Sequence, residues 1–259
     1  MRIGFIGSGN MASALIRSVK GKASIIASDR DKIKLSRIRK LGVKTTLDNK
    51  EVAKNSDVIF LCTKPNDISS VLQEIKGYLR SKTIVSIAAG IRIDSVENII
   101  GKGIGIIRVM PNLNCTVGEM AAAYSANKFV KNRDKKAIHN LLNSAGIAVE
   151  IKEEQMDAVT ALSGSGPAFA AYLIGKFADA GEKQGLSKEI SYKLALQTFY
   201  GTSVLLRETK EDPKEMVRRV SSPNGTTVAG LKILENEKTD EIIAKAINAA
   251  SKRSRELGK

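Results

Sequence analysis

The sequence predicts an α/β protein in which a doubly wound, mostly parallel sheet comes first and an all-helical region follows. Up to about residue 150, short apolar β-branched runs alternate with helical patterns, which is typical of right-handed βαβ units. After Gln155 the strand-like runs disappear, and Ala-, Leu- and Gly-rich stretches with helical spacing take over. We therefore predict two domains, 1–152 and 153–259.

Six strands are expected in the first domain, and helical segments such as Asn10–Lys20 and Lys32–Leu41 lie between them. The strands are Ile3–Ile6, Ser24–Ser28, Val43–Thr46, Val58–Cys62, Thr83–Ile87 and Gly105–Val109. Four helices are expected in the second domain, with Pro213 and Pro223 in their connections. These helices are Pro167–Gln184, Lys188–Glu208, Thr226–Asn236 and Thr239–Glu256.

Composition narrows the class of protein. The chain has 259 residues, of which 42% are hydrophobic, so it can bury a sizeable core. Cys62 and Cys115 stand alone, which favours a reduced cytoplasmic protein over a disulfide scaffold or a metal site. We read no signal peptide after Met1. The longest uncharged run, 158–175, is interrupted by glycines and Pro167, so we expect no membrane helix.

Positive charge is concentrated in the first half of the chain. Residues 1–150 hold 25 Lys and Arg against 12 Asp and Glu, a net +13, whereas residues 151–259 hold 17 against 15, a net +2. Such an excess suits either a nucleic-acid surface or a site for a phosphate-rich small ligand. No nucleic-acid motif with interleaved aromatics accompanies the charge, so we favour the small ligand and expect no nucleic-acid partner.

The sharpest local signal is a glycine-rich turn directly after the first strand. The sequence Gly7-Ser-Gly9-Asn-Met-Ala12 has the GxGxxA spacing and precedes a helical pattern. The first glycine permits a tight turn, the second lets a pyrophosphate approach the backbone, and the small Ala12 allows close helix–strand packing. The turn predicts a Rossmann-type dinucleotide site. The cofactor-binding residues expected here are Ile6, Gly7, Ser8, Gly9, Asn10 and Met11.

The end of the second strand, Ser28-Asp29-Arg30, bears on the choice of cofactor. An acidic residue here hydrogen-bonds the 2′-hydroxyl of NAD, whereas a nearby Arg accommodates the 2′-phosphate of NADP. Asp29 favours NAD, and Ser28 with Arg30 favours NADP. Asp29 alternatively caps the helix that begins near Asp31. We predict NADPH, with NADH as the alternative.

Two distant segments indicate the family. Asp157-Ala-Val-Thr-Ala-Leu-Ser-Gly-Ser165-Gly-Pro-Ala-Phe and Ser221-Ser-Pro-Asn-Gly-Thr-Thr227-Val-Ala-Gly closely resemble signatures of pyrroline-5-carboxylate reductase. The resemblance covers essentially the whole chain. It includes Lys64-Pro65, Ser86-Ile-Ala-Ala-Gly90 and Met110-Pro-Asn112. It implies hydride transfer from NAD(P)H to the C=N carbon of a small cyclic imine, Δ1-pyrroline-5-carboxylate, giving L-proline, with no metal.

The resemblance also assigns roles to residues. Thr227 would hydrogen-bond the imine nitrogen as the catalytic residue. The substrate-binding set would be Ser165, Asn224, Gly225, Thr226 and Thr227, although 163–167 also suits a simple helix start. Further cofactor-lining residues would be Asn49, Thr63, Lys64, Pro65, Ala88 and Ala89. The helices of the second domain resemble those that family members interleave, which implies dimerisation and a homodimer or larger homo-oligomer.

Four departures from the family pattern bear on the substrate. They are Leu113-Asn114-Cys115, Asn224 in place of a glycine, Val217-Arg218 in place of a Lys-Asp pair, and Cys62-Thr63 in place of Ala-Val. Asn tolerates a positive φ, so the turn at Asn224 is expected to survive. Two alternatives follow: a reductase of a different cyclic imine, and a non-catalytic dinucleotide-binding regulatory protein. His139, the single histidine, is expected on the surface.

Overall fold

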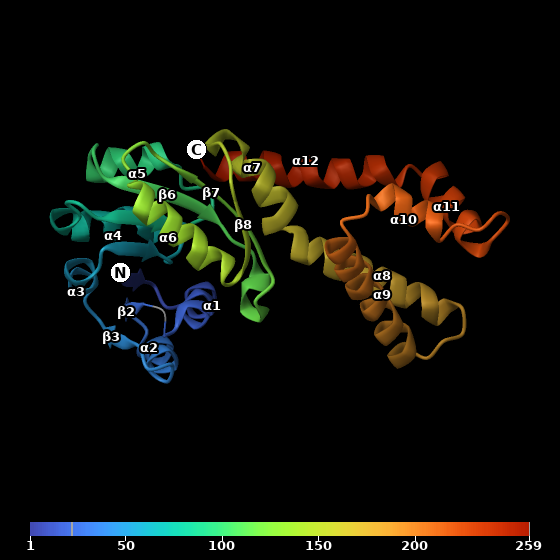
Figure 1. Cartoon of the computed structure of the whole chain (residues 1–259), viewed down its shortest axis with the longest axis horizontal. Helices are drawn as coiled ribbons and strands as arrows, with labels where there is room; N and C mark the ends of the chain where they lie inside the picture. The colour runs from blue at the N-terminus through green and yellow to red at the C-terminus, as the bar shows by residue number, and fades with distance from the viewer. Residues whose placement is uncertain (22, 259) are drawn as a thin grey trace. The chain divides into compact units, whose positions relative to one another are not determined.

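The structure is a computed structural model that describes residues 1–21 and 23–258 (Figure 1). The chain divides into two compact units. The sheet unit comprises Met1–Ser165 with Ala249–Lys259, and the helical unit comprises Gly166–Asn248. The predicted division at 152/153 is a different partition of the chain and stays a prediction. Its last residue, Lys259, lies outside the described residues.

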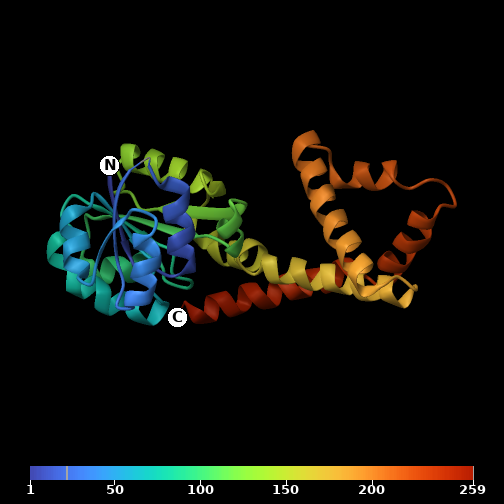
Figure 2. The ribbon, with the colours of Figure 1, turned by 90° about the horizontal axis from the view of Figure 1, so that it is seen from below.

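An eight-stranded sheet forms the centre of the sheet unit (Figure 2), in the order β3-β2-β1-β4-β5-β6-β7-β8. The strands are β1 Arg2–Ile6, β2 Ser24–Ser28, β3 Lys44–Thr46, β4 Val58–Leu61, β5 Thr83–Ser86, β6 Gly105–Met110, β7 Met120–Ala126 and β8 Gly146–Glu150. All six predicted strands are present and parallel to one another. β7 runs antiparallel to β6, and β8 pairs parallel with β7. The predicted Rossmann-type sheet is therefore confirmed, with two strands added.

Helices cover both faces of this sheet. They are α1 Asn10–Val19, α2 Lys32–Arg39, α3 Asn49–Asn55, α4 Ile68–Ile75, α5 Ile93–Ile100 and α6 Asn132–Asn143. One apolar cluster joins the sheet to α1, α2 and α6, and a second joins it to α3, α4 and α5. Phe5 and Phe60 stack across β1 and β4 with ring centroids 4.9 Å apart. Each fully buried large side chain contributes about 1.5–3 kcal/mol, so the two clusters hold this unit together.

A helical run follows the sheet. It consists of η4 Glu153–Gln155, α7 Met156–Val159, the π-helical turn η5 Thr160–Gly164 and α8 Gly166–Lys183. The π turn lies where Gly164 approaches Met110, because a Cβ on Gly164 would come within 2.5 Å of the Met110 Cε. By length and composition alone, the run Glu153–Lys183 is apolar enough to cross a membrane. A helix that packs against another protein chain has the same composition.

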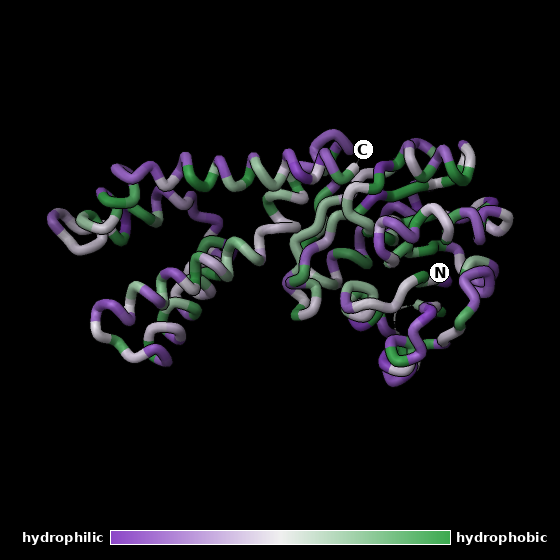
Figure 3. The backbone as a smooth tube through the Cα atoms, turned by 180° about the vertical axis from the view of Figure 1, so that it is seen from behind, coloured by the Kyte–Doolittle hydropathy of each residue, from purple (hydrophilic) through white to green (hydrophobic). Residues whose placement is uncertain are grey.

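The helical unit contains α8, α9 Lys188–Thr209, α10 Pro213–Arg219, α11 Thr226–Asn236 and most of α12 Thr239–Leu257. This confirms the predicted all-helical second half. The α8–α9 connection turns at Gly185, whose φ is +94°, and Ser187 caps α9 by accepting a hydrogen bond from the Ile190 N–H. Phe177 and Phe199 meet edge to face between α8 and α9. Apolar and polar residues alternate along these helices (Figure 3).

Candidate functional site

The glycine turn between β1 and α1 explains both of its glycines in physical terms. Gly7 has φ +95°, and a Cβ there would come within 2.7 Å of the Cys62 carbonyl group, so the fold itself requires glycine. Gly9 has an ordinary extended conformation, with φ −71° and ψ −172°, and a Cβ there would meet nothing within 4 Å. Nothing among residues 1–21 and 23–258 therefore requires glycine at position 9. The open space beside it suits a ligand that approaches the backbone closely.

Asp29 holds this turn in place. Its Oδ2 accepts a hydrogen bond from the Ser8 N–H at 2.7 Å, and its Oδ1 accepts one from the Asp31 N–H at 2.9 Å. The cap of α2 is Asp31, whose Oδ1 accepts from the backbone N–H groups of Ile33 and Lys34. The alternative in which Asp29 caps this helix is therefore wrong. Asp29 braces the glycine turn from the end of β2.

A short chain of side-chain hydrogen bonds begins at Ser28, the residue before Asp29. The Ser28 side chain is fully buried, and its hydroxyl donates to the Asn49 Oδ1 at 2.7 Å. The Asn49 amide in turn donates to the Glu74 Oε2 at 2.8 Å. Ser28 therefore orients Asn49, and of the two it is Asn49 that reaches the cavity described next.

A cavity of about 390 Å³ opens at the carboxyl ends of β1, β2 and β4. The strand order changes direction here, between β1 and β4, and open α/β sheets bind ligands at such a switch point. Predicted cofactor residues on its wall are Ile6, Gly7, Gly9, Asp29, Arg30, Asn49, Thr63 and Lys64. The Thr63 Oγ1 is buried and has no hydrogen-bond partner among the described residues. An unsatisfied hydroxyl on a cavity wall suits a polar ligand.

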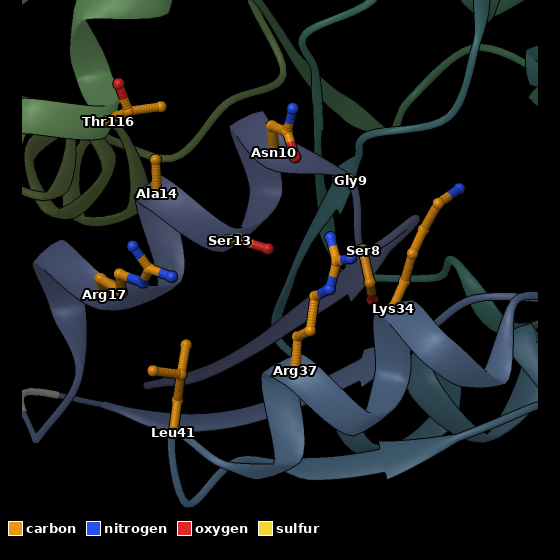
Figure 4. A pocket seen from close by; sticks show the side chains of 10 residues that line it. All are labelled: Ser8, Gly9, Asn10, Ser13, Ala14, Arg17, Lys34, Arg37, Leu41 and Thr116. Atoms are coloured by element: carbon orange, nitrogen blue, oxygen red, sulfur yellow. The ribbon is translucent and has the colours of Figure 1, made fainter.

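The other predicted cofactor residues fall outside this cavity. Ser8 and Asn10 line a second cavity beside the turn (Figure 4). Met11 packs partly against the apolar core. Pro65 is exposed at the start of η1 Pro65–Asp67. After β5, Ala88 is buried, whereas Ala89 is exposed. Direct contact with a cofactor stays a prediction for every residue of the set, including those on the cavity walls.

In the helical unit, the predicted substrate-binding residues form the turn into α11. Asn224 has φ +56°, so the expected left-handed conformation is present. Gly225 precedes the helix, and a Cβ there would come within 2.4 Å of the Ser222 Oγ. Thr226 and Thr227 occupy the first turn. The half-buried Thr227 hydroxyl makes no hydrogen bond within the described part of the chain. The Gly225 N–H donates to the Ser222 carbonyl at 2.9 Å, whereas the N–H groups of Thr226 and Thr227 have no partner within the described residues.

Ser165 lies at the end of the sheet unit, directly after the π turn, and its N–H donates to the Thr160 carbonyl at 2.9 Å. α8 begins at Gly166 with Pro167 in its first turn, so the segment 163–167 does contain a helix start, and a role of Ser165 at the substrate stays a prediction beside it. Single π turns inside α-helices often occur at functional sites. Ser165 and Thr227 belong to different compact units.

The residues that depart from the family pattern have ordinary surroundings. Leu113 is exposed in η3 Leu113–Val117, whereas Cys115 is buried there, and burial raises the pKa of the Cys115 thiol to about 11. Burial also raises the pKa of the Cys62 thiol. Val217 is exposed, and Arg218 forms an ion pair with Glu215. Both thiols stay protonated at neutral pH, so neither is a ready nucleophile.

No group of three or more His, Cys, Asp or Glu side chains that could hold a metal ion occurs among residues 1–21 and 23–258. His139 is half-buried rather than simply solvated. Its ring lies 3.2 Å from the Tyr124 hydroxyl and 2.9 Å from the Asn143 amide. These neighbours give His139 a structural role.

Three cations beside the turn were not predicted as site residues. Lys34 lines both cavities, and Arg17 and Arg37 line the second one. Their positions on α1 and α2 are set by helical spacing, since 34 and 37 are one turn apart. The signal in the sequence was the dense positive charge of this stretch, which did not indicate which cations face the turn.

Comparison with known proteins gives matches over the whole chain. A family model described as "Pyrroline-5-carboxylate reductase dimerisation" matches residues 153–257. A second, described as "NADP oxidoreductase coenzyme F420-dependent", matches residues 2–90. Two similar relatives are pyrroline-5-carboxylate reductases. The one from Aquifex aeolicus is 40% identical over 99% of this chain and 97% of its own. The one from Methanosarcina acetivorans is 38% identical over 100% and 98%.

Solved structures agree with these matches. A pyrroline carboxylate reductase from Plasmodium falciparum, with NADP bound, has a TM-score of 0.89 and 35% identity, covering 100% of this chain and 98% of its own. A pyrroline-5-carboxylate reductase from Coxiella burnetii has a TM-score of 0.95 and 34% identity, covering 99% and 98%. An imine reductase from Myxococcus stipitatus is 20% identical with a TM-score of 0.58, which is a likeness of fold alone.

Proposed function

The chain belongs to the pyrroline-5-carboxylate reductase family, and from this premise we infer that it reduces 1-pyrroline-5-carboxylate to L-proline with NADPH. The observation that carries this conclusion is the match along the whole chain, at 40% identity over 99% of its length. A relative that covered only the sheet unit would have supported dinucleotide binding and nothing more. The alternative of a non-catalytic regulatory protein is set aside for the same reason.

The dinucleotide site fits the residues of this chain. A reduced nicotinamide cofactor, when bound, supplies the hydride. The open backbone at Gly9 and the start of α1 would receive the pyrophosphate, because a helix N-terminus presents unpaired N–H groups. The Thr63 hydroxyl, which has no partner in the described structure, would gain one. Asp29 and Asn49 are already held in place by the chain's own hydrogen bonds.

For the substrate, we propose that the turn into α11 binds and orients the imine. The Thr227 hydroxyl would hydrogen-bond the ring nitrogen, and the N–H groups of Asn224, Thr226 and Thr227 would bind the carboxylate, whereas the Gly225 N–H already donates to the Ser222 carbonyl. Two features support this proposal: the hydroxyl is free, and the turn begins a helix of 11 residues. We also propose that Ser165, directly after the π turn η5, contacts the substrate.

The chemistry asked of the protein is mainly orientation. A protonated or hydrogen-bonded imine is already a good electrophile, and positioning alone can lower a barrier by several kcal/mol. Both cysteine thiols have raised pKa values, and His139 bonds to Tyr124 and Asn143, so these groups take no part in the proposed reaction.

The protein is a homo-oligomer, because the dimerisation model of its family spans 153–257. We propose a homodimer as the smallest form. Large apolar side chains of α8 and α9 that are exposed in a single chain support this homodimer. They include Tyr172, Phe177, Leu194 and Tyr200. Such faces are covered in the assembled state. The cytoplasmic location is likewise a proposal, supported by the two unpaired cysteines.

Thr227→Ala tests the proposed hydrogen bond between the Thr227 hydroxyl and the imine nitrogen. We expect kcat to fall by about 100-fold with NADPH affinity unchanged, because the substitution removes a hydrogen bond at the reacting centre. Thr227→Ser keeps the hydroxyl and should retain most of the rate. The measurement is the decrease in NADPH absorbance with pyrroline-5-carboxylate. An unchanged kcat in the Ala variant would contradict the role of Thr227 without touching the family activity.

A related substrate remains a second candidate, because Asn224 places an exposed side chain at the turn into α11. A six-membered or differently substituted cyclic imine would meet this side chain. Comparing kcat/KM for several cyclic imines separates the two. The five-membered carboxylated ring should be reduced fastest, and a clear preference for another ring would replace our substrate.

A further inference from the structure

A second cavity, of about 180 Å³, lies between α1 and α2 beside the glycine turn. Ser8, Asn10 and Ser13 line its α1 side, and Lys34 and Arg37 line its α2 side. Figure 4 shows the Arg37 side chain extending from α2 toward Ser8, and the Lys34 side chain extending from the same helix past Ser8. The two cavities share Gly9 and Lys34 on their walls, so this one adjoins the proposed dinucleotide site.

The surroundings of this cavity carry much of the positive charge of the chain. Residues 17–44 hold ten Lys and Arg against two Asp, a net +8 of the +13 found in residues 1–150. Arg17 and Arg37 form no ion pair within the described part of the chain. Lys34 has only long contacts, with its Nζ 3.9 Å from an Asp29 oxygen and 4.0 Å from an Asp31 oxygen. Cations gathered without counter-ions favour an anionic ligand.

The carboxylate that would recognise an unmodified ribose is already engaged. Each Asp29 oxygen accepts a backbone N–H, from Ser8 and from Asp31, and the Asp29 side chain is only 13% exposed. Each oxygen can accept a second hydrogen bond, but at this exposure little of the carboxylate is open to a ribose 2′-hydroxyl. A 2′-phosphate instead needs cations, and Lys34 and Arg37 supply two of them on the same side of the turn.

We propose that Lys34 and Arg37 bind the 2′-phosphate of NADPH at the mouth of the α1–α2 cavity and thereby make this enzyme select NADPH over NADH. The proposal rests on the dinucleotide chemistry of the proposed function. It adds to Arg30, which lines the larger cavity from the β2–α2 connection. The planar Arg37 guanidinium can donate two parallel hydrogen bonds, and Lys34 contributes a compact charge.

The test compares Lys34→Ala, Arg37→Ala and the double variant with Lys32→Ala. Lys32 is a matched control, because it lies on the same helix but lines a different depression with Arg39 and Thr45. Calorimetry at fixed ionic strength would give Kd values for NADPH, NADH, 2′,5′-ADP and 5′-AMP. Circular dichroism would confirm that each variant is folded.

We expect each single substitution to raise Kd for NADPH and 2′,5′-ADP by about tenfold, and the double variant by about 100-fold. Kd for NADH and 5′-AMP should change less than twofold, as should every value for Lys32→Ala. Equal weakening of NADPH and NADH would overturn the proposal, because the cations would then serve the pyrophosphate. An equal effect of Lys32→Ala would also overturn it, since that would indicate only the general positive field.

The outcomes also separate this inference from the proposed function. If the unaltered protein binds NADPH but reduces no imine, the proposed function fails and the binding comparison still decides the role of Lys34 and Arg37. If the unaltered protein reduces pyrroline-5-carboxylate and the variants keep its cofactor preference, the function stands and this inference fails.

Discussion

The two compact units differ in how much of their core one chain supplies. The sheet unit encloses two apolar clusters, with Phe5, Leu15, Phe60 and many others fully buried. In the helical unit, the buried apolar residues among those described are two small ones, Ala178 and Ala195, and one larger one, Met216. Large side chains there are open to solvent, with Tyr172 65% and Tyr200 62% exposed. The sheet unit completes its own core, whereas the helical unit needs a second copy to cover it.

The same contrast holds for the proposed cofactor-binding and substrate-binding residues. The glycine turn is organised by bonds within the sheet unit, from Asp29 and Asn49. Thr227 lies in the unit whose apolar faces remain open in one chain. We therefore expect dinucleotide binding to tolerate loss of assembly better than catalysis does.

The largest expected effect comes from breaking the assembly. Ile190 and Leu194 are one turn apart on α9 and are 49% and 56% exposed. Leu194→Asp would bury a carboxylate in the proposed interface, so we expect mainly monomer by light scattering and at least a 100-fold loss of activity. NADPH binding should persist. Lys193→Asp, at the neighbouring exposed position, is the control and should remain assembled. A Leu194→Asp oligomer with normal activity would contradict the comparison.

Next in size is the contrast between the two glycines of the turn. Gly7→Ala combines a positive φ with a 2.7 Å approach to backbone, and we expect it to lower the free energy of unfolding by about 3 kcal/mol. The Cβ of Gly9→Ala would lie more than 4 Å from any atom of the described residues other than its chain neighbours, so the substitution should leave stability unchanged, yet weaken NADPH binding by tenfold or more. Urea unfolding and calorimetry measure the two effects. Destabilisation by Gly9→Ala would show that the chain itself requires this glycine.

A moderate effect is expected from changing Asp29, which holds the glycine turn in place. Asp29→Ala removes the acceptor of the Ser8 N–H, so affinities for NADPH and NADH should fall together, by about tenfold. Asp29→Asn retains one acceptor oxygen and should recover most of both affinities. Fluorescence titration of each reduced cofactor measures this. A selective loss of NADH in the Ala variant would mean that Asp29 binds the ribose directly.

The smallest effect concerns the ion pair between Arg2, at the start of β1, and Asp57. The Arg2 side chain and backbone N–H both donate to Asp57, which lowers the pKa of that carboxyl to about 2. A depressed pKa adds stability above the unfolded value of about 3.9, and this is lost as pH falls from there toward 2. Asp57→Asn should therefore unfold with a slightly weaker dependence on pH in that window. The effect is small because both side chains are solvent-exposed, and an unchanged pH profile would show that the ion pair contributes nothing.

Much of this protein was determined by sequence alone. Residues Ile3–Ile6 and Gly7–Ala12 predicted the first strand and the turn, because a short apolar run and glycine spacing are local properties. The strand Ser24–Ser28 and the helix Thr226–Asn236 have the predicted bounds. The strands β7 and β8 were missed, because the Ala-rich run Met120–Ala126 has weak β-propensity and becomes a strand only by pairing with β6.

The tertiary structure decided how the site residues are used. Sequence placed Ser28, Asp29 and Arg30 near a ribose, but hydrogen bonds from distant parts of the chain turn Asp29 toward Ser8 and bury Ser28 against Asn49. The same packing brings Lys34 on α2 to the cavity beside α1. Local patterns determine which elements form, since their causes lie within a few residues. The direction of a side chain depends on groups about 20 residues away that only the fold brings into contact.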